Sequence, residues 1–154
     1  MAEMHALTIR QPWASAIAYG TKRVENREWR LSAKVVGEVI AIHAGKGHDL
    51  DAALPAGCRW PEVETHSLGA VIAVAEIAGC HPPGACVGGG TTGKLGERGH
   101  LWCSPWAMPG QFHIELTSVR PLPNPVPCRG MLGLWWLPED VAEAVRAQLE
   151  ASRG

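Results

Sequence analysis

Apolar and polar residues alternate along parts of this chain and run together in others, and both patterns predict strands. The most apolar run covers residues 69–77 and is uninterrupted until Glu76, which is typical of a central, buried strand. Residues 112–116 alternate strictly between apolar and polar, which predicts a strand with one buried face. Four further strands are predicted, at residues 7–9, 24–29, 37–44 and 132–137.

Two helices are predicted from the residues at their ends. Pro12 suits a first helical turn, because its fixed φ and missing N–H cost nothing there, and Gly20 suits the C-terminal cap of a helix over residues 13–19. Pro138 introduces a second helix at about residues 138–151, with acidic residues in its first turn, where the helix dipole favours them. Prolines and glycines from about residue 82 to 99 predict a glycine-rich surface loop.

Together these elements predict one α+β domain over residues 1–154, built as a small β-barrel of about five to six strands with short flanking helices. A chain of 154 residues with 46% hydrophobic and 19% charged content is typical of one such domain. No apolar run approaches the roughly 18 to 20 residues that a membrane helix requires, and the N-terminus lacks a signal-peptide pattern. We therefore expect a cytoplasmic protein with no membrane segment.

Charge and aromatic content change this picture only locally. The net charge of −1, from 14 basic and 15 acidic residues, does not indicate a nucleic-acid-binding protein. Residues 1–48, however, contain seven basic and four acidic residues, so the N-terminal part is basic. The chain also has seven Trp against one Tyr and one Phe. A tryptophan can fill the core or offer a flat face on which a base stacks, and composition leaves both uses open.

The cysteines give little support for a metal or a disulfide framework. There are five, and no two have the Cys-x-x-Cys spacing of a zinc knuckle or a redox motif. One stretch is rich in soft metal ligands whose spacing matches no common zinc finger: Cys80, His81, Cys86, His100 and Cys103. We therefore expect free, mostly buried thiols, no bound metal and no cofactor.

Reactive and charged side chains are concentrated between residues 10 and 27. The basic and acidic side chains include those of Arg10, Lys22, Arg27 and Glu25. Gln11 adds an amide and Trp13 an indole. Glu25 and Arg27 share one face of the predicted strand, because side chains repeat every two residues. Lys22 has two interpretations. It forms an ion pair with Glu25 that closes the turn, or it faces a phosphate or carbonyl oxygen in a cleft.

The order of these residues resembles the opening of ASCH domains, named for activating signal cointegrator homology. The resemblance rests on Leu-Thr-Ile-Arg-Gln-Pro-Trp-Ala at residues 7–14 and Gly-Thr-Lys-Arg-Val-Glu-Asn-Arg-Glu-Trp at residues 20–29. Residues 37–46, 69–76 and 125–135 resemble later strands of the family. The resemblance covers most of the chain, and only the glycine-rich loop and the last helix fall outside it.

This resemblance implies a fold similar to the PUA domain, a five- or six-stranded barrel with a helix beside a cleft. It also implies binding of RNA, of another single-stranded nucleic acid or of a modified nucleoside in that cleft. The residues expected to form a basic binding cleft, with no metal among its components, are Arg10, Gln11, Trp13, Lys22, Glu25, Arg27, Trp29, His43 and Lys46.

Two other functions follow from the same family. Some members are ribonucleases, and a small group hydrolyses the acetyl amide of acetylated cytidine. The lysine of that group falls on Lys22, its threonine falls on Glu25, and Glu76 is proposed from its position in the chain as the catalytic glutamate. The third possibility is a protein-interaction module that uses the glycine-rich loop and the C-terminal helix. The sequence leaves open whether the protein is an enzyme.

Overall fold

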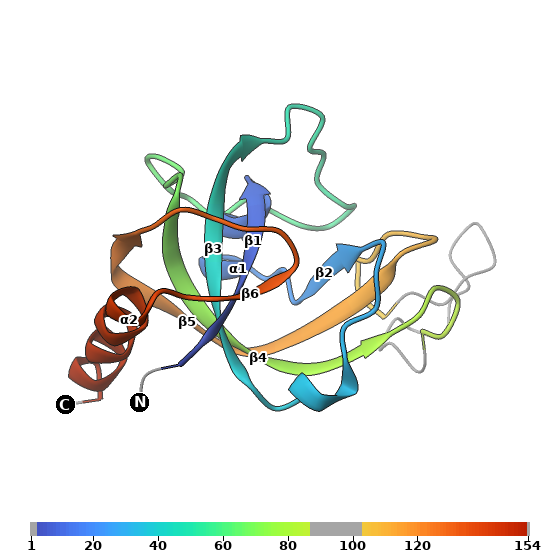
Figure 1. Ribbon diagram of the computed structural model, residues 1–154. Coiled ribbons are helices and arrows are strands. Elements are labelled where there is room, and N and C mark those ends of the chain that lie inside the picture. The colour runs from blue at the N-terminus through green and yellow to red at the C-terminus, as the bar shows by residue number, and fades with distance from the viewer. Residues whose placement is uncertain (1–2, 87–102, 154) are drawn as a thin grey trace.

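Six strands form one mixed sheet, and two α-helices and a one-turn 3-10 helix (Ala33–Val35) flank it in this computed structural model, which describes residues 3–86 and 103–153 (Figure 1). The α-helices are α1 (Trp13–Ala18) and α2 (Glu139–Ala151). The strands are β1 (His5–Gln11), β2 (Val24–Arg27), β3 (Val39–His48), β4 (Ala70–His81), β5 (Phe112–Pro127) and β6 (Leu134–Trp136). The α+β class and the strand number expected from the sequence are confirmed. The predicted glycine-rich loop lies mostly outside the described residues.

The strands follow the order β2-β5-β4-β3-β1-β6, and only the pair of β1 and β3 is parallel. β4 and β5 are the longest strands, and Figure 1 shows them curving across the molecule. The short helix α1 connects β1 to β2 and packs against β1, β3, β4 and β5. The curved sheet therefore wraps around α1, and this places the residues that flank α1 on its concave side.

The closed barrel predicted from the sequence is not confirmed. β6 pairs only with His5–Leu7 of β1, and β2 pairs only with β5, so the pairings of the described strands leave a gap between β2 and the later part of β1. The side chain of Arg27 bridges this gap, because its Nη2 donates to the Thr8 carbonyl at 2.7 Å. β2, with four residues, and β6, with three, stand at the two ends of the strand order and do not pair with each other.

Two buried clusters cover the two faces of the sheet. β4 contributes to both, since Ile72 packs in the cluster around α1 and Val71 in the cluster beneath α2. Val145 and Trp135 belong to the α2 cluster and are buried. No helix in the described part of the chain is long and apolar enough to cross a membrane.

Candidate functional site

A pocket of about 780 Å³ lies at the gap between β1 and β2. Its walls come from β1, the start of α1, β2, and the segments 49–55 and 105–111. A volume of several hundred cubic ångströms is typical of a site for a small organic molecule. We call it the Trp13 pocket. Six of the residues predicted from the sequence line it: Arg10, Trp13, Lys22, Glu25, Arg27 and Trp29.

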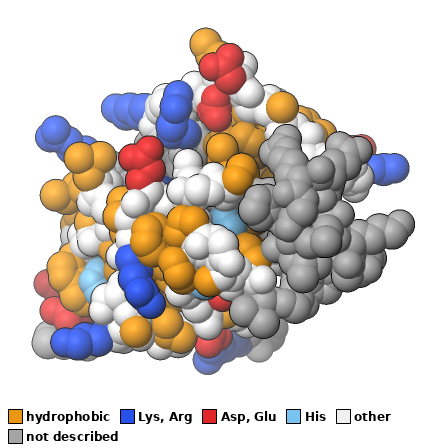
Figure 2. Space-filling model, turned by 90° about the vertical axis from the view of Figure 1, so that its right-hand side faces the viewer, with side chains coloured by type: hydrophobic (Ala, Val, Ile, Leu, Met, Phe, Trp, Pro, Cys, Tyr) orange, Lys and Arg blue, Asp and Glu red, His pale blue; other side chains and the backbone are white. Residues whose placement is uncertain are grey.

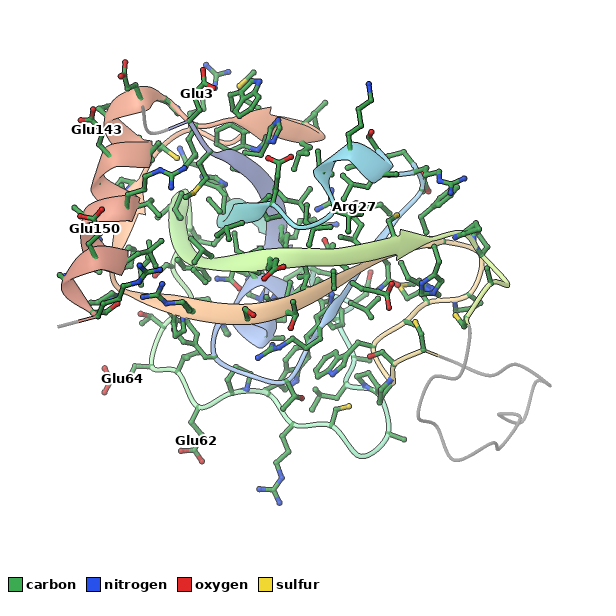
Figure 3. The ribbon with its side chains drawn as sticks, turned by 90° about the horizontal axis from the view of Figure 1, so that it is seen from below. Glu3, Arg27, Glu62, Glu64, Glu143 and Glu150 are labelled. Atoms are coloured by element: carbon green, nitrogen blue, oxygen red, sulfur yellow. The ribbon has the colours of Figure 1, made fainter. Side chains whose placement is uncertain are left out.

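One wall of the Trp13 pocket is a network of ionic groups. Lys22 is only 2% exposed, and its Nζ donates to the Val24 carbonyl and, at 2.9 Å, to Glu25 Oε1. The other oxygen of Glu25 accepts from Arg27 Nη2 at 2.9 Å. The structure therefore contains the ion pair between Lys22 and Glu25, and it also places Lys22 in the pocket wall. Figure 3 shows Arg27 among the strands, whereas Glu62 projects away from the molecule.

Glu25 is held in its charged form. Burial by itself would raise the pKa of Glu25, but the positive charges of Lys22 and Arg27, with the hydrogen bonds that both donate, bring the pKa below its ordinary value. Each carboxylate oxygen is already bound to one cation. Arg27 Nε, in contrast, is the one buried side-chain nitrogen or oxygen among residues 3–86 and 103–153 that has no hydrogen-bond partner. The network thus retains one unused donor.

Trp13 and Trp106 line this pocket, and Trp60 packs against both of them. The ring centroids of Trp13 and Trp60 are 5.3 Å apart, and each lies 6.3 Å from the centroid of Trp106. The indole of Trp13 is held in place because its Nε1 donates to Asp49 at 2.8 Å. Lys22 Nζ lies 5.9 Å from the centroid of the same ring, within the range of a cation–π contact. The pocket therefore combines fixed aromatic faces with fixed charges.

The segment after Cys103 forms the opposite wall, and Asn26 attaches it to β2. The side chain of Asn26 donates to the Trp106 carbonyl at 3.0 Å and accepts from the Met108 backbone N–H at 2.8 Å. One amide group thus satisfies two backbone groups that are some 80 residues away in the chain. Sequence reasoning missed Asn26, Asp49 and Trp106 as pocket residues. The only sequence feature that pointed to Trp106 was the high number of tryptophans in the chain.

A second pocket, of about 700 Å³, includes Lys46, Arg129 and Gly130 in its lining, and we call it the Lys46 pocket. Thr8 lines both pockets, so they lie on either side of this residue. His43 lines the Lys46 pocket but is 1% exposed. Its Nε2 donates to the Cys128 carbonyl at 2.8 Å, and its Nδ1 lies 3.3 Å from the Thr8 hydroxyl.

The surroundings of His43 favour a structural role. Burial lowers its pKa below the ordinary value, although the hydrogen bond to the Cys128 carbonyl opposes this effect. Both ring nitrogens already have partners within the fold. A Cβ atom on Gly130 would lie 2.8 Å from the ring, so the absence of a side chain there lets the backbone pack over His43.

Two other predicted residues lie outside both pockets. Gln11 is fully buried, donates from Nε2 to the Ser67 carbonyl at 2.9 Å and accepts from the Ser15 backbone N–H at 3.0 Å. It therefore joins the end of β1 to α1. Glu76 lies on β4 opposite Thr117 of β5, and the structure does not bring it to Lys22 or Glu25.

The charges of the two pockets differ. The Trp13 pocket has three basic and four acidic lining residues: Arg10, Lys22 and Arg27 against Glu25, Glu28, Asp49 and Asp51. The Lys46 pocket has two basic residues, Lys46 and Arg129, and no acidic residue among those that the structure describes. On the face in Figure 2, basic and acidic side chains are likewise interspersed. The predicted residues thus do not form one basic cleft.

Soft metal ligands form a separate cluster at the end of β4. His81, Cys86 and Cys103 are brought together there by the fold, and His113 joins them. Cys80 instead packs against the core, and His100 lies outside the described residues. All five cysteines are free, as expected, but the prediction that they are mostly buried is wrong. Each is half-buried, because all five lie at strand ends or in loops rather than inside strands.

The comparisons with known proteins agree with this architecture. Residues 7–116 match the ASCH domain family. Solved structures of the Zymomonas mobilis ASCH protein and of a serine-to-alanine mutant of that protein each superpose with a TM-score of 0.54. The sequence identities are 16% for the ASCH protein, covering 96% of both chains, and 15% for the mutant, covering 94% of both.

No curated protein matches the sequence significantly. The identities to the solved structures are low, so these structures support the fold alone. The family match, in contrast, covers more than half of the 154 residues and includes the motif that supplies Arg10, Trp13, Lys22, Glu25 and Arg27 to the pocket. On this basis the chain belongs to the ASCH domain family.

Proposed function

We propose that this ASCH domain binds one base of single-stranded RNA, or a modified nucleoside, in the Trp13 pocket. The observation that carries the proposal is the juxtaposition of fixed indoles and a buried ionic network in one cavity of nucleoside size. A nucleobase has a flat face that stacks on an indole and an edge that forms hydrogen bonds. The pocket provides groups suited to both.

The charges of the pocket support a base or nucleoside as its occupant. Three cations and four carboxylates give no excess of positive charge that would bind a run of phosphates. Arg27 lines the pocket, and its guanidinium is a donor of the kind that a base oxygen or ring nitrogen accepts from. Phosphates of the flanking nucleotides would meet Arg10 at the rim and Lys46 and Arg129 beyond Thr8.

Titration of the protein with short single-stranded RNA tests the proposal. Trp13→Ala should weaken binding by about 5- to 150-fold, because stacking contributes about 1–3 kcal/mol per base. Trp136→Ala is the matched control, since Trp136 is 57% exposed on β6 and lines neither pocket. Equal affinities of the two variants would contradict the proposal, provided that circular dichroism shows both to be folded.

The hydrolase alternative depends on Lys22, whose buried ammonium lies in the wall of the same pocket. Glu25 is ion-paired on both oxygens and Glu76 is elsewhere, so neither provides Lys22 with a free carboxylate partner. The same protein samples, incubated with acetylcytidine and with RNA, separate the two functions. Product that forms with the wild type and not with Lys22→Met would favour a hydrolase over a binding domain.

A further inference from the structure

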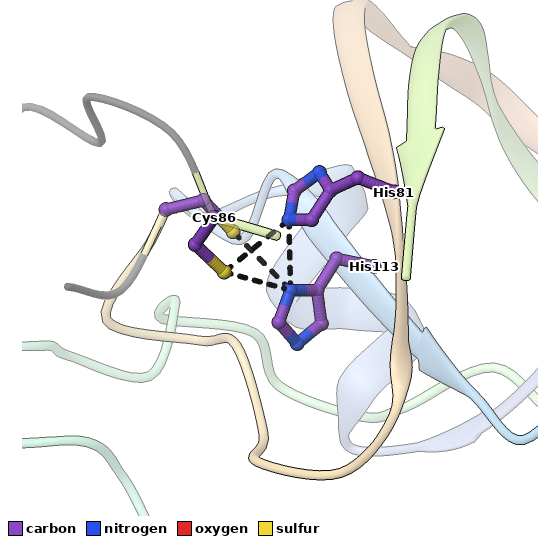
Figure 4. Close-up of side chains that lie close together, drawn as sticks. His81, Cys86 and His113 are labelled. Atoms are coloured by element: carbon purple, nitrogen blue, oxygen red, sulfur yellow. Dashed lines mark hydrogen bonds between the residues drawn. The ribbon is translucent and has the colours of Figure 1, made fainter. Parts of the chain in front are cut away.

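Four side chains with soft ligand atoms meet at the open end of the β4–β5 pair (Figure 4). His81 is the last residue of β4 and pairs across the sheet with His113, near the start of β5. Cys86 and Cys103 lie in the connection between these strands. One atom from each of the four residues lies within 4.8 Å of all the others.

The ligand atoms point at one another. His81 Nε2 is 3.0 Å from His113 Nδ1 and 3.3 Å from Cys86 Sγ. His113 Nδ1 lies 3.3 Å from Cys86 Sγ and 3.4 Å from Cys103 Sγ. Around a tetrahedral zinc ion, with bonds of about 2.0–2.3 Å, the ligand atoms would be about 3.3–3.8 Å apart. The four distances given lie within a few tenths of an ångström of this range, and every other pair of ligand atoms lies within 4.8 Å, so small side-chain shifts would let the cluster surround such an ion.

The outer contacts of the two histidines, a hydrogen bond for His113 and an ion-pair contact for His81, direct their lone pairs into the cluster. His113 Nε2 is 2.7 Å from the Met108 carbonyl, which can only accept, so this nitrogen carries the proton of the neutral ring and Nδ1 is free to bind. His81 Nδ1 lies 3.4 Å from a carboxylate oxygen of Glu115, which favours a proton on Nδ1 and a lone pair on Nε2. Two lone pairs then face each other across 3.0 Å, an arrangement that a cation between them would stabilise.

This outer shell has the form that protein zinc sites use. Metal-bound histidines usually donate their second N–H to a backbone carbonyl or a carboxylate, which fixes the ring and raises its basicity. Here His113 has the carbonyl and His81 has the carboxylate. Gly79 contributes as well, because a Cβ there would come within 2.7 Å of Glu115 Oε2 and displace the carboxylate.

We propose that His81, Cys86, Cys103 and His113 bind one Zn²⁺ ion in a structural Cys₂His₂ site. Two thiolates and two imidazoles are a donor set that suits zinc, and four protein ligands fill its tetrahedral sphere, leaving no position for a catalytic water. Binding releases the two thiol protons, so the bound site is electrically neutral. The ion ties Cys86 and Cys103 to the ends of β4 and β5.

This inference departs from the expectation of no metal that the spacing of the cysteines suggested. Sixteen residues separate Cys86 from Cys103, and no common zinc finger has this spacing. The spacing along the chain does not bring four ligands together, but the pairing of β4 with β5 does, because it places His81 directly opposite His113.

The first test uses the whole chain, purified in the presence of reductant without a histidine tag. Elemental analysis should find about one zinc per chain. After chelation, titration with Co²⁺ should give the intense visible bands of a tetrahedral ion and the charge-transfer band of a thiolate ligand. Neither measurement depends on a variant that folds poorly.

Single substitutions then test the ligands. Cys86→Ser and Cys103→Ser should each weaken zinc binding, measured by competition with a chromophoric chelator, by more than the roughly 10–100-fold that losing an outer-shell partner costs. Glu115→Gln should weaken it within that range and keep the tetrahedral cobalt spectrum. Cys58→Ser is the matched control, a half-buried free cysteine outside the cluster, and should bind zinc as the wild type does.

Three results would overturn the proposal. One is a reduced wild-type chain that binds no zinc and gives no tetrahedral cobalt spectrum. Another is zinc affinity in Cys86→Ser and Cys103→Ser equal to that of Cys58→Ser. The third is a disulfide between Cys86 and Cys103 in protein isolated without reductant, combined with no zinc binding once that disulfide is reduced.

Discussion

Lys22, Glu25 and Arg27 show how a short motif creates a buried ionic network. Glu25 accepts from a cation at each oxygen, and Arg27 extends the network by donating to the Thr8 carbonyl across the gap in the sheet. A buried carboxylate is tolerable only when its charge is compensated in this way. The same contacts that hold β2 against β1 thus fix the charged wall of the Trp13 pocket.

Replacing Glu25 tests this network at the residue scale. Glu25→Gln leaves Lys22 and Arg27 without their anion, so the free energy of unfolding at neutral pH should fall by about 3 kcal/mol, as for other broken buried pairs. Denaturant titration measures the change. Glu28→Gln, at an exposed position in the same pocket, is the control and should change stability by no more than about 0.5 kcal/mol.

The pH dependence of this difference follows from the lowered pKa of Glu25. The carboxylate stabilises the fold fully above its unfolded pKa of about 4.5, and this contribution is lost as the pH falls through the lower folded value. The gap in stability between the wild type and Glu25→Gln should therefore narrow below about pH 4.5. A gap that stays constant down to the acid transition would show that Glu25 is not stabilised as an anion.

At the scale of elements, the segment 105–111 forms one wall of the Trp13 pocket. Its attachment to β2 keeps that wall in place opposite the ionic network. Asn26 provides both hydrogen bonds of this attachment. The proposed zinc site adjoins the same segment, since His113 donates to the Met108 carbonyl at 2.7 Å. The wall is therefore fixed from two sides by groups far apart in sequence.

Asn26→Ala should loosen this wall without unfolding the sheet. The Trp106 carbonyl and the Met108 N–H lose their partner, and each lost hydrogen bond outside the buried core costs about 0.5–1.5 kcal/mol. Hydrogen exchange should show faster exchange at the Met108 amide, and affinity for RNA should fall. Asn124→Ala is the control, because Asn124 contacts Gln148 through its backbone and not through its side chain. An unchanged Met108 amide would show that Asn26 does not hold the wall.

Several elements were predictable because local signals agree with the tertiary structure. The apolar run in β4 and the Pro12 and Gly20 signals around α1 each correspond to an observed element. β5 was harder, because four prolines interrupt its second half: Pro121, Pro123, Pro125 and Pro127. Pro121 and Val126 still pair with β4, and a register shift between them accommodates the prolines without ending the strand.

Over the whole molecule, positive charge is divided between two sites. The Trp13 pocket is mixed in charge, and the Lys46 pocket beyond Thr8 has Lys46 and Arg129 with no acid among its described lining residues. A base in one pocket and phosphates over the other would place one nucleotide chain across β1. Under the proposed function, this division would allow a chain with a net charge of −1 to bind an anionic polymer.

The salt dependence of RNA binding tests this division. The double variant Lys46→Gln/Arg129→Gln removes two phosphate contacts, so the slope of log affinity against log salt should become shallower by roughly 1–2 units. Lys34→Gln, at an exposed residue on the 3-10 helix outside both pockets, should leave the slope unchanged. Equal slopes for the double variant and the wild type would exclude phosphate contacts at the Lys46 pocket.

The sequence by itself determined the family, the α+β class and the ionic motif of the Trp13 pocket, because these depend on residues close together in the chain. Tertiary structure decided the rest. It left the sheet open between β1 and β2, buried His43 and Gln11 in hydrogen bonds within the fold, and brought Trp106 to Trp13. It also placed His113 beside His81, 32 residues away. Strand register sets such contacts, and register depends on the packing of the whole sheet rather than on any local pattern.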